Sequence, residues 1–370
     1  MPPQTQTVFR LTSRNGFDGL QAFKEPVPTI GDYEVLVKIR SVSINYRDIA
    51  IANDTYPLMV KDQVIPCSDM AGEVVEVSSQ VDDISIGDNV VAPISSSALY
   101  GPVKEDRNSL GGGKDGVLRE YIVLPAHVVI KLPKSPHSFS EWAALVGTGT
   151  TIWNCFYGCV PLKPGQTVLI QGTGGVALTA LIFARAAGAT TILTSSSDEK
   201  LEKVKAKYIV DHTINYKKHP NWAAEVKRIT NGQGADHVIE NGGIGTIQQS
   251  LECVTMGGTI SLVGFLTSIP QDQVPDVTLL AISKGATLHG ILGGSKQQLE
   301  EAVNFVGSRN LPVPVDKTFG FNRGDIIAAL RYVESGQHIG KVCINLDEGA
   351  SARSWRPVPM ISSISRTCTP

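Results

Sequence analysis

Apolar and polar positions follow different patterns in the two parts of the chain. Between residues 5 and 130 the apolar residues come in short runs, which predict strands at 34–40 and 71–77 and a turn entering a third at 87–93. Proline and glycine interrupt these runs, and no long helical pattern occurs. A compact, partly open barrel is favoured over a sandwich, although periodicity alone does not separate them. The polar, glycine-rich stretch 95–116 is predicted to be a surface loop, either a linker or a lid over a pocket.

Beyond residue 133 strands and helices alternate. Ser138 and Glu141 have the spacing of a capping box and predict the start of a helix. The strands that follow are nearly all apolar, which implies a parallel sheet covered by helices on both faces. The predicted strands are 167–171, 190–195, 209–213, 236–240 and 258–263. The predicted helices between them are 175–187, 198–206, 220–230 and 245–254.

The last part of the chain is predicted to hold an edge strand at 288–292, an amphipathic helix at 297–306, a strand from Phe319, a helix at 324–334 and a strand at 341–346. Beyond Leu346 serine, proline and arginine occur without periodicity. A loosely held tail is therefore predicted over 347–370, with a packed extension as the alternative.

A glycine-rich stretch joins the first strand of the alternating region to its helix. In Val168-Leu-Ile-Gln-Gly-Thr-Gly-Gly-Val-Ala177 the first glycine permits a tight turn, and the second lets the backbone approach a pyrophosphate. Ala177 is small enough for close packing of helix on strand, and the helix N-terminus offers free N–H groups to phosphate. A plain tight turn between strand and helix is the alternative. The predicted cofactor contacts of this phosphate loop are Gly172, Thr173, Gly174, Gly175 and Val176.

Composition narrows the possible partners and compartments. The 370 residues include 33 basic and 35 acidic side chains, so neither nucleic acid nor an anionic membrane is expected as the main ligand. The N-terminal sequence lacks the features of a secretory signal, and no apolar stretch has the length of a membrane span. Six scattered cysteines without a C-x-x-C pair predict free thiols and a cytoplasmic location.

The order and spacing of several motifs resemble the medium-chain dehydrogenase/reductase superfamily over roughly residues 7–346. The resemblance rests on 43–48 (SINYRD), 65–73 (IPCSDMAGE), 87–90 (GDNV), 172–177, 214–216 (INY), 257–264 (GGTISLVG) and 336–341 (GQHIGK). It implies an α/β protein with a GroES-like β-barrel catalytic domain over 1–130 and a doubly wound Rossmann NADP-binding domain over 131–294. Residues 295–346 would return to the catalytic domain, and the active site would lie in the cleft between the domains.

The resemblance also raises the question of zinc. Zinc-dependent members supply a cysteine near the start of the barrel, a Gly-His-Glu motif, and a later cysteine before the Rossmann strand. The corresponding positions here hold Asn45, Ser68 with Asp69, and Gly147. Since catalytic zinc needs nitrogen, sulfur or carboxylate ligands that converge, no metal is expected. The chain resembles the zinc-independent branch, the quinone oxidoreductase-like and enoyl reductase-like enzymes.

The second Rossmann strand bears on the choice of cofactor. NAD-specific sites place an acid at the end of this strand, and here Ser195 and Ser196 stand there instead. Lys200 is close enough in sequence to supply a positive charge, and Tyr216 matches a tyrosine of the adenosine pocket in NADPH-using relatives. The acid Asp198 is assigned to the first turn of a helix. NADPH is therefore predicted over NADH.

Metal-free hydride transfer needs donors at the oxygen that becomes negative and a proton source. The resemblance nominates Asn45 to orient substrate or nicotinamide and Tyr46 and Tyr56 as possible phenol donors. It places further contacts with the nicotinamide and its ribose at Thr148, Thr151, Gly242, Phe265 and Leu266. The predicted reaction reduces an activated alkene, quinone or carbonyl of a small-molecule substrate. An alcohol dehydrogenase and a non-catalytic NADPH-binding protein remain alternatives, and a homodimer paired through the edge strand near Leu288 is expected.

Overall fold

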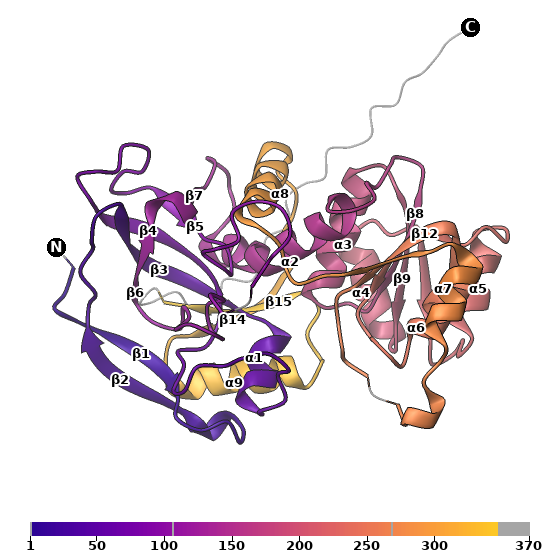
Figure 1. Cartoon of the computed structure of the whole chain (residues 1–370), viewed down its shortest axis with the longest axis horizontal. Helices are drawn as coiled ribbons and strands as arrows, with labels where there is room; N and C mark the ends of the chain where they lie inside the picture. The colour runs from indigo at the N-terminus through magenta and orange to yellow at the C-terminus, as the bar shows by residue number, and fades with distance from the viewer. Residues whose placement is uncertain (1, 106, 268, 347–370) are drawn as a thin grey trace, which may run out of the picture.

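Two sheets stand on either side of the long helix α2 (Phe139–Tyr157) in the computed structural model, which describes residues 2–105, 107–267 and 269–346 (Figure 1). Helix α2 begins at a capping box: Ser138 Oγ accepts from the Glu141 N–H, and the Glu141 carboxylate accepts from the Ser138 N–H at 2.8 Å. The predicted start of this helix is therefore confirmed. Its apolar side chains pack toward both domains, so α2 forms part of the wall between them.

The N-terminal domain is built around strand β3 (Glu34–Ile44). One edge of β3 pairs with β4 (Asp69–Val77), and the other is shared between β6 (Tyr121–Pro125) and the distant strand β15 (Lys341–Asn345). The sheet order is β14-β15-β3-β4-β5-β7, with β6 beside β3. The remaining strands are β1 (Thr5–Leu11) and β2 (Leu20–Pro26), which pair with each other, and β5 (Asn89–Val91), β7 (Ile130–Lys131) and β14 (Val315–Gly320).

The second domain is a six-stranded parallel sheet with the order β10-β9-β8-β11-β12-β13. This is the order of a doubly wound nucleotide-binding sheet, with its topological switch point between β8 and β11. Its strands are β8 (Thr167–Gln171), β9 (Thr190–Ser195), β10 (His212–Asn215), β11 (Ala235–Glu240), β12 (Val254–Leu262) and β13 (Thr287–Gly290). Its helices are α3 (Gly175–Ala186), α4 (Asp198–Lys207), α5 (Trp222–Ile229), α6 (Ile247–Cys253) and α7 (Val277–Lys284).

Alternate residues of β8 explain why helices cover both faces of this sheet. Val168 and Ile170 belong to the core that includes Leu178 of α3, whereas Leu169 belongs to the core that includes Trp222 of α5. All three strand residues are fully buried, so the strand is continuously apolar in sequence.

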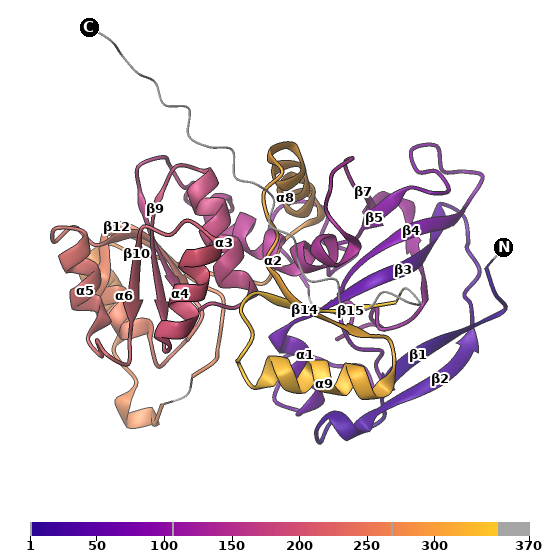
Figure 2. The ribbon, with the colours of Figure 1, turned by 180° about the vertical axis from the view of Figure 1, so that it is seen from behind.

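The last part of the chain returns to the N-terminal domain. Helix α8 (Lys296–Arg309) packs against α2, and α9 (Arg323–Glu334) lies beside the short helix α1 (Tyr46–Ala52), as Figure 2 shows. Three short 3-10 helices complete the described elements at Phe17–Gly19, Ala126–Val128 and Gln271–Gln273. Within the described residues no helix is both long and apolar enough to cross a membrane.

Several local predictions were wrong. Helices α1 and α7 were not predicted, because one has only seven residues and the other has no buried face to give an apolar period. The strand predicted at 209–213 lies at His212–Asn215, and the strand predicted from Phe319 begins at Val315. The predicted tail 347–370 lies outside the described residues.

The stretch 95–116 is not simply a surface loop. Ser109 and Leu110 are buried, and a Cβ on Gly111, whose φ is +71°, would lie 2.6 Å from the Cys67 carbonyl oxygen. The Arg47 guanidinium donates to the Leu110 carbonyl at 3.0 Å. These contacts dock the middle of the stretch on the N-terminal domain, and Gly111 allows the close approach to Cys67.

Candidate active site

The predicted phosphate loop has the expected strand–turn–helix geometry. Gly172 follows β8 with a φ of +89°, which favours glycine, and its N–H donates to the Thr194 carbonyl at 2.9 Å. Gly174 is the N-cap of α3, and the helix begins at Gly175. The free N–H groups of the first turn therefore lie beside the switch point, where such sheets bind ligands.

A buried carboxylate organises the backbone at that switch point. Glu240, at the end of β11, is fully buried and accepts from Gln171 Nε2 at 2.8 Å. It also accepts from the N–H groups of Gly242 at 2.9 Å and Gly243 at 3.0 Å. The hydroxyls of two further residues donate to the same carboxylate, those of Thr246 and Ser250. The predicted end of this strand at residue 240 is confirmed, and the Glu240 carboxylate caps the turn that follows it.

The residues predicted to contact the adenosine end of the cofactor come together at the ends of β9 and β10. Tyr216 N–H donates to the Ser195 carbonyl at 3.0 Å, and Ser196 is partly exposed beside them. The nearby Asp198 carboxylate instead accepts from Asn215 Nδ2 at 2.7 Å and pairs with Lys218. These two partners lower the pKa of Asp198, led by the Lys218 ammonium. The Asp198 carboxylate is thus engaged by Asn215 and Lys218.

Lys200 has partners that the sequence did not predict. Its Nζ donates to the backbone carbonyls of Gly336 and His338, which belong to the turn before β15. The same turn meets the phosphate loop, since the Gly340 N–H donates to the Thr173 carbonyl at 3.0 Å. The turn before β15 therefore contacts both α4 and the phosphate loop. A contact of Lys200 with the cofactor stays a prediction.

The positions that lack zinc ligands converge on a buried lysine. Lys341, the first residue of β15, donates to Asn45 Oδ1 at 2.6 Å and to the Ile44 carbonyl at 2.5 Å, and its Nζ lies 4.0 Å from Asp69 Oδ2. The Asp69 carboxylate accepts from the Gly147 N–H at 2.9 Å. A Cβ at Gly147 would lie 2.5 Å from that carboxylate, so this network needs glycine there.

This donor set does not fit a zinc ion. Zinc prefers thiolate, imidazole and carboxylate ligands in tetrahedral geometry, and here only Asp69 belongs to that set. Its oxygens already accept from Gly147 N–H and Ser68 Oγ, and the amide oxygen of Asn45 accepts from an ammonium. No group of three or more histidine, cysteine or acidic residues able to hold a metal occurs within the described ranges.

A second buried acid lies beside this network. Asp48 Oδ2 accepts from the Asn45 N–H at 2.8 Å, while Oδ1 is buried without a hydrogen-bond partner. Burial raises the pKa of Asp48 from 3.8 to about 6, against the opposing charge of Arg47. The bond of Asp48 to Asn45 and that of Arg47 to Leu110 are contacts within the N-terminal domain.

The two domains also meet through aromatic rings at this site. Tyr46 at the start of α1 and Phe265 after β12 pack edge to face, with ring centroids 6.0 Å apart. Both side chains are about half exposed, as is Leu266, so they line an open part of the boundary between the domains. Tyr56 is partly buried, and the Arg47 guanidinium lies 5.4 Å from its ring centroid.

The two predicted threonines of α2 are buried. Thr148 Oγ1 donates to the Ala144 carbonyl at 2.8 Å and accepts from Thr179 of α3 at 3.1 Å. The Thr148 hydroxyl is therefore engaged in packing α2 on α3, and Thr151 is 9% exposed. Contacts of Thr148 and Thr151 with cofactor or substrate stay predictions.

Lys341 and Gln171 are the site residues that sequence reasoning missed. The one signal for Lys341 was a lone lysine opening an apolar strand in the motif 336–341, to which no role was assigned. Gln171 interrupts the apolar strand β8 at its last residue, where its Oε1 accepts from Asn241 and Gly242 N–H groups.

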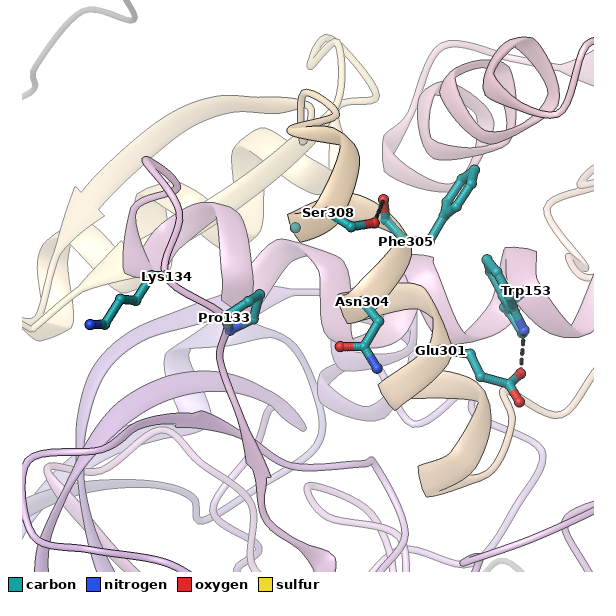
Figure 3. Close-up of a pocket in the computed structure, with 8 residues that line it drawn as sticks. Pro133, Lys134, Trp153, Glu301, Asn304, Phe305 and Ser308 are labelled. Carbon is teal, nitrogen blue, oxygen red and sulfur yellow. Dashed lines mark hydrogen bonds between the residues drawn. The ribbon is translucent and has the colours of Figure 1, made fainter.

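A separate hollow of about 550 Å³ lies beside α8 and is also lined by Trp153 of α2 and by Pro133 and Lys134 (Figure 3). Trp153 Nε1 donates to Glu301 at 2.5 Å within it, and Phe305 packs against the Trp153 ring. None of its lining residues belongs to the phosphate loop, the Glu240 network or the Lys341 network. It is therefore a different surface feature from the candidate active site.

The fold and site define a class, a two-domain oxidoreductase with a dinucleotide-binding domain, and comparisons identify the family. The profile of the alcohol dehydrogenase GroES-like domain matches residues 31–134, and that of zinc-binding dehydrogenases matches 175–308. A zinc-type alcohol dehydrogenase-like protein of Schizosaccharomyces pombe is 40% identical over 341 residues, covering 90% of this chain and 97% of that protein. The chain belongs to the medium-chain dehydrogenase/reductase superfamily.

Solved structures agree with this assignment. A structure from Sinorhizobium meliloti 1021, provisionally described as an alcohol dehydrogenase, has a TM-score of 0.84 at 33% identity and covers 94% of this chain and 100% of its own. An NAD-dependent alcohol dehydrogenase has a TM-score of 0.81 at 26% identity, covering 92% of this chain and 100% of its own. The predicted fold, a GroES-like domain with a Rossmann domain, is confirmed.

Proposed function

We propose that the chain is a zinc-independent, NADPH-dependent reductase that transfers hydride to an activated alkene, a quinone or a carbonyl. The observation that carries the proposal is the Lys341 ammonium, bonded to Asn45 and 4.0 Å from Asp69, at the positions where zinc-dependent relatives supply metal ligands. A cation and its hydrogen-bonding partners already fill this donor set, so the site supports chemistry that relies on protein donors.

The preference for NADPH rests on the end of β9. Ser196 presents a hydroxyl where NAD-specific enzymes present a carboxylate, and Asp198 is engaged with Asn215 and Lys218. A 2′-phosphate would therefore meet hydroxyl groups, with Lys200 nearby, and no free acid to repel it. The proposed cofactor contacts are those of the phosphate loop together with Ser195, Ser196, Lys200, Tyr216, Gly242, Phe265 and Leu266.

The nicotinamide supplies the hydride, and the protein's own groups handle the charge that develops. The Asn45 amide is the proposed donor to the substrate oxygen, because it lies beside the boundary between the domains and is only partly buried. The Tyr46 phenol, about half exposed beside Phe265, is the proposed proton source. The packed rings of Tyr46 and Phe265 would also limit access of water to the reacting atoms.

Two alternatives make different demands on the site. An alcohol dehydrogenase acting in the oxidative direction would need a strong base or metal for the alcohol, and the Lys341 network offers neither. A non-catalytic NADPH-binding protein would keep the phosphate loop and bind cofactor tightly without turnover.

The proposed assembly rests on an edge strand and an apolar helix face, and the proposed location rests on the cysteines. No strand of the described residues pairs with the outer edge of β13, and Leu279 and Ile282 of the preceding helix α7 are 62% and 72% exposed. We therefore propose a homodimer formed through β13 and α7. The five described cysteines are free thiols, which supports a cytoplasmic enzyme. Small molecules, rather than nucleic acid or membrane, are the proposed partners.

The test is a reduction assay of purified protein with NADPH or NADH and a panel of enones, quinones and aldehydes. The proposal expects turnover that strongly favours NADPH, persists with chelator, and occurs in protein without stoichiometric zinc. Equal turnover with NADH would overturn the cofactor assignment, and loss of activity with chelator would overturn the metal-free mechanism. Tight NADPH binding without turnover over the whole panel would favour the non-catalytic alternative.

A further inference from the structure

Lys341 determines which end of the Asn45 amide faces away from the protein core. The ammonium has three donors and no acceptor, so the amide atom 2.6 Å from it is the oxygen. The Asn45 Nδ2 group then points to the other side of the amide. No described residue accepts a hydrogen bond from it, and the Asn45 side chain is only partly buried. Asn45 can therefore act toward a ligand as a donor.

We propose that Lys341 is a positioning residue that fixes Asn45 as the hydrogen-bond donor to the reacting oxygen of a carbonyl or enone substrate. This inference rests on the proposed function and adds the residue that orients the proposed donor. A bond from an ammonium is stronger than one between neutral groups, and it polarises the amide so that Nδ2–H becomes a better donor. An oxygen that becomes negative during hydride transfer gains more from such a donor than the ground-state carbonyl does.

The phosphate loop holds Lys341 in place for this role. A Cβ at Gly175 would lie 2.3 Å from Lys341 Cδ and 3.3 Å from the Thr148 methyl, so the lysine stem occupies the space that a side chain at Gly175 would need. The Gly340 N–H bond to Thr173 fixes the backbone next to it. The Lys341 ammonium donates to the carbonyl of Ile44, the last residue of β3 in the N-terminal domain. Lys341 therefore links the cofactor loop of one domain to the substrate donor of the other.

The proposal is tested by a double-mutant cycle of Lys341→Met and Asn45→Ala, measured with NADPH and the best substrate of the panel. Each single variant is expected to lower kcat about 10- to 100-fold, because each removes the oriented donor. The double variant is expected to match Asn45→Ala within about twofold, because a residue that acts through Asn45 has no effect once Asn45 is gone. Losses that multiply would overturn the proposal.

Two further variants separate positioning from folding. Lys341→Met leaves the Asp69 carboxylate without its cation, so the pair Lys341→Met with Asp69→Asn removes both charges and keeps the fold testable. Asn45→Asp keeps a partner for Lys341 and removes the donor, so it is expected to lose kcat like Asn45→Ala. Retained kcat in Asn45→Asp would overturn the proposal, and the Kd for NADPH is expected to stay within about threefold throughout.

A readout independent of turnover distinguishes this inference from the proposed function. The side-chain amide resonance of Asn45, assigned by its loss in Asn45→Asp, is expected to shift in Lys341→Met and not in the control Lys131→Met, whose lysine pairs with Asp88 elsewhere. If the wild type is inactive and the resonance still shifts in Lys341→Met, the proposed function fails and the Lys341–Asn45 contact is supported. An unchanged resonance would overturn the contact whatever the activity.

Discussion

Gln171 and Glu240 end neighbouring parallel strands and join them through a 2.8 Å hydrogen bond at the switch point of the sheet. Glu240 is fully buried and accepts from five donors, none of which is a cation among the described residues. Its two carboxylate oxygens hold the turn 241–246 that is proposed to flank the nicotinamide. Burying a carboxylate costs far less free energy when its acceptor sites are satisfied in this way.

Substituting Glu240→Gln is expected to destabilise the protein by about 2–3 kcal/mol, because one acceptor becomes an NH₂ group facing donors. Chemical denaturation followed by circular dichroism measures the change. The control Glu202→Gln removes an exposed carboxylate on α4, paired with Lys205, and should change stability by less than about 1 kcal/mol. Equal stability of the two variants would contradict the role given to Glu240.

Cofactor preference is expected to respond to a single acid at the end of β9. Ser196→Asp places a carboxylate where a 2′-phosphate is proposed to bind, so KM for NADPH should rise about 10- to 100-fold by charge repulsion. The KM for NADH should fall or stay the same, because a ribose hydroxyl can donate to the new acid. Steady-state kinetics with both cofactors measure the ratio.

The control for this change is Ser79→Asp, which adds the same charge at an exposed position of the other domain. A similar loss of NADPH affinity in both variants would show a general charge effect, and the Ser196 assignment would then fail.

The raised pKa of Asp48 predicts a pH-dependent cost of folding. Burial raises its pKa from 3.8 to about 6, so the folded protein holds the Asp48 proton more tightly than the unfolded chain does. The contribution of this proton to folding stability is complete below the unfolded pKa of 3.8 and is lost as the pH rises through about 6. Asp48→Asn cannot ionise and can still accept from the Asn45 N–H. The variant should therefore gain stability over wild type between pH 5 and 8, by up to about 3 kcal/mol at 1.36 kcal/mol per pKa unit.

Thermal unfolding of wild type and Asp48→Asn across this pH range gives the difference. A gap that stays constant with pH would show that Asp48 does not titrate there. A gap that shrinks as pH rises would contradict the sign of the pKa shift.

The proposed dimer predicts a localised sensitivity to charge. Ile282→Glu puts a carboxylate on the exposed apolar face of α7 beside the edge strand, so it should convert the dimer to monomer in light scattering. Ile86→Glu changes an equally exposed isoleucine, 70% exposed, in the other domain and should leave the assembly unchanged. A monomeric wild type would remove the proposal.

The sequence pattern predicted those parts of the structure that depend on interactions between residues close together in the chain. The continuous apolar strand β8 and the glycines after it predicted the phosphate loop, because turn geometry at Gly172 and helix capping at Gly174 involve adjacent residues. The end of β11 at Glu240 was predicted for the same reason. The docking of 95–116 was not, since it depends on contacts with Arg47 and Cys67 far away in the sequence.

The Lys341 network illustrates the limit of sequence reasoning. Lys341 and Ile44 are 297 positions apart, and no periodicity links a lysine at the start of one strand to the last residue of another. The absence of zinc ligands at Asn45 and Gly147 could be found by resemblance. The cation that lies among those positions could be found only from the folded chain.

The place of β15 beside β3 has a consequence for the order in which the molecule is completed during synthesis. Residues 41–44 leave the ribosome early, yet the strand that pairs with them is made about 300 residues later. The parallel sheet of the second domain has all its strands by residue 290, while the first domain still has an open edge on its central strand. A chain that stops before residue 341 therefore has every strand of the parallel sheet but lacks Lys341 and the strand that pairs with residues 41–44.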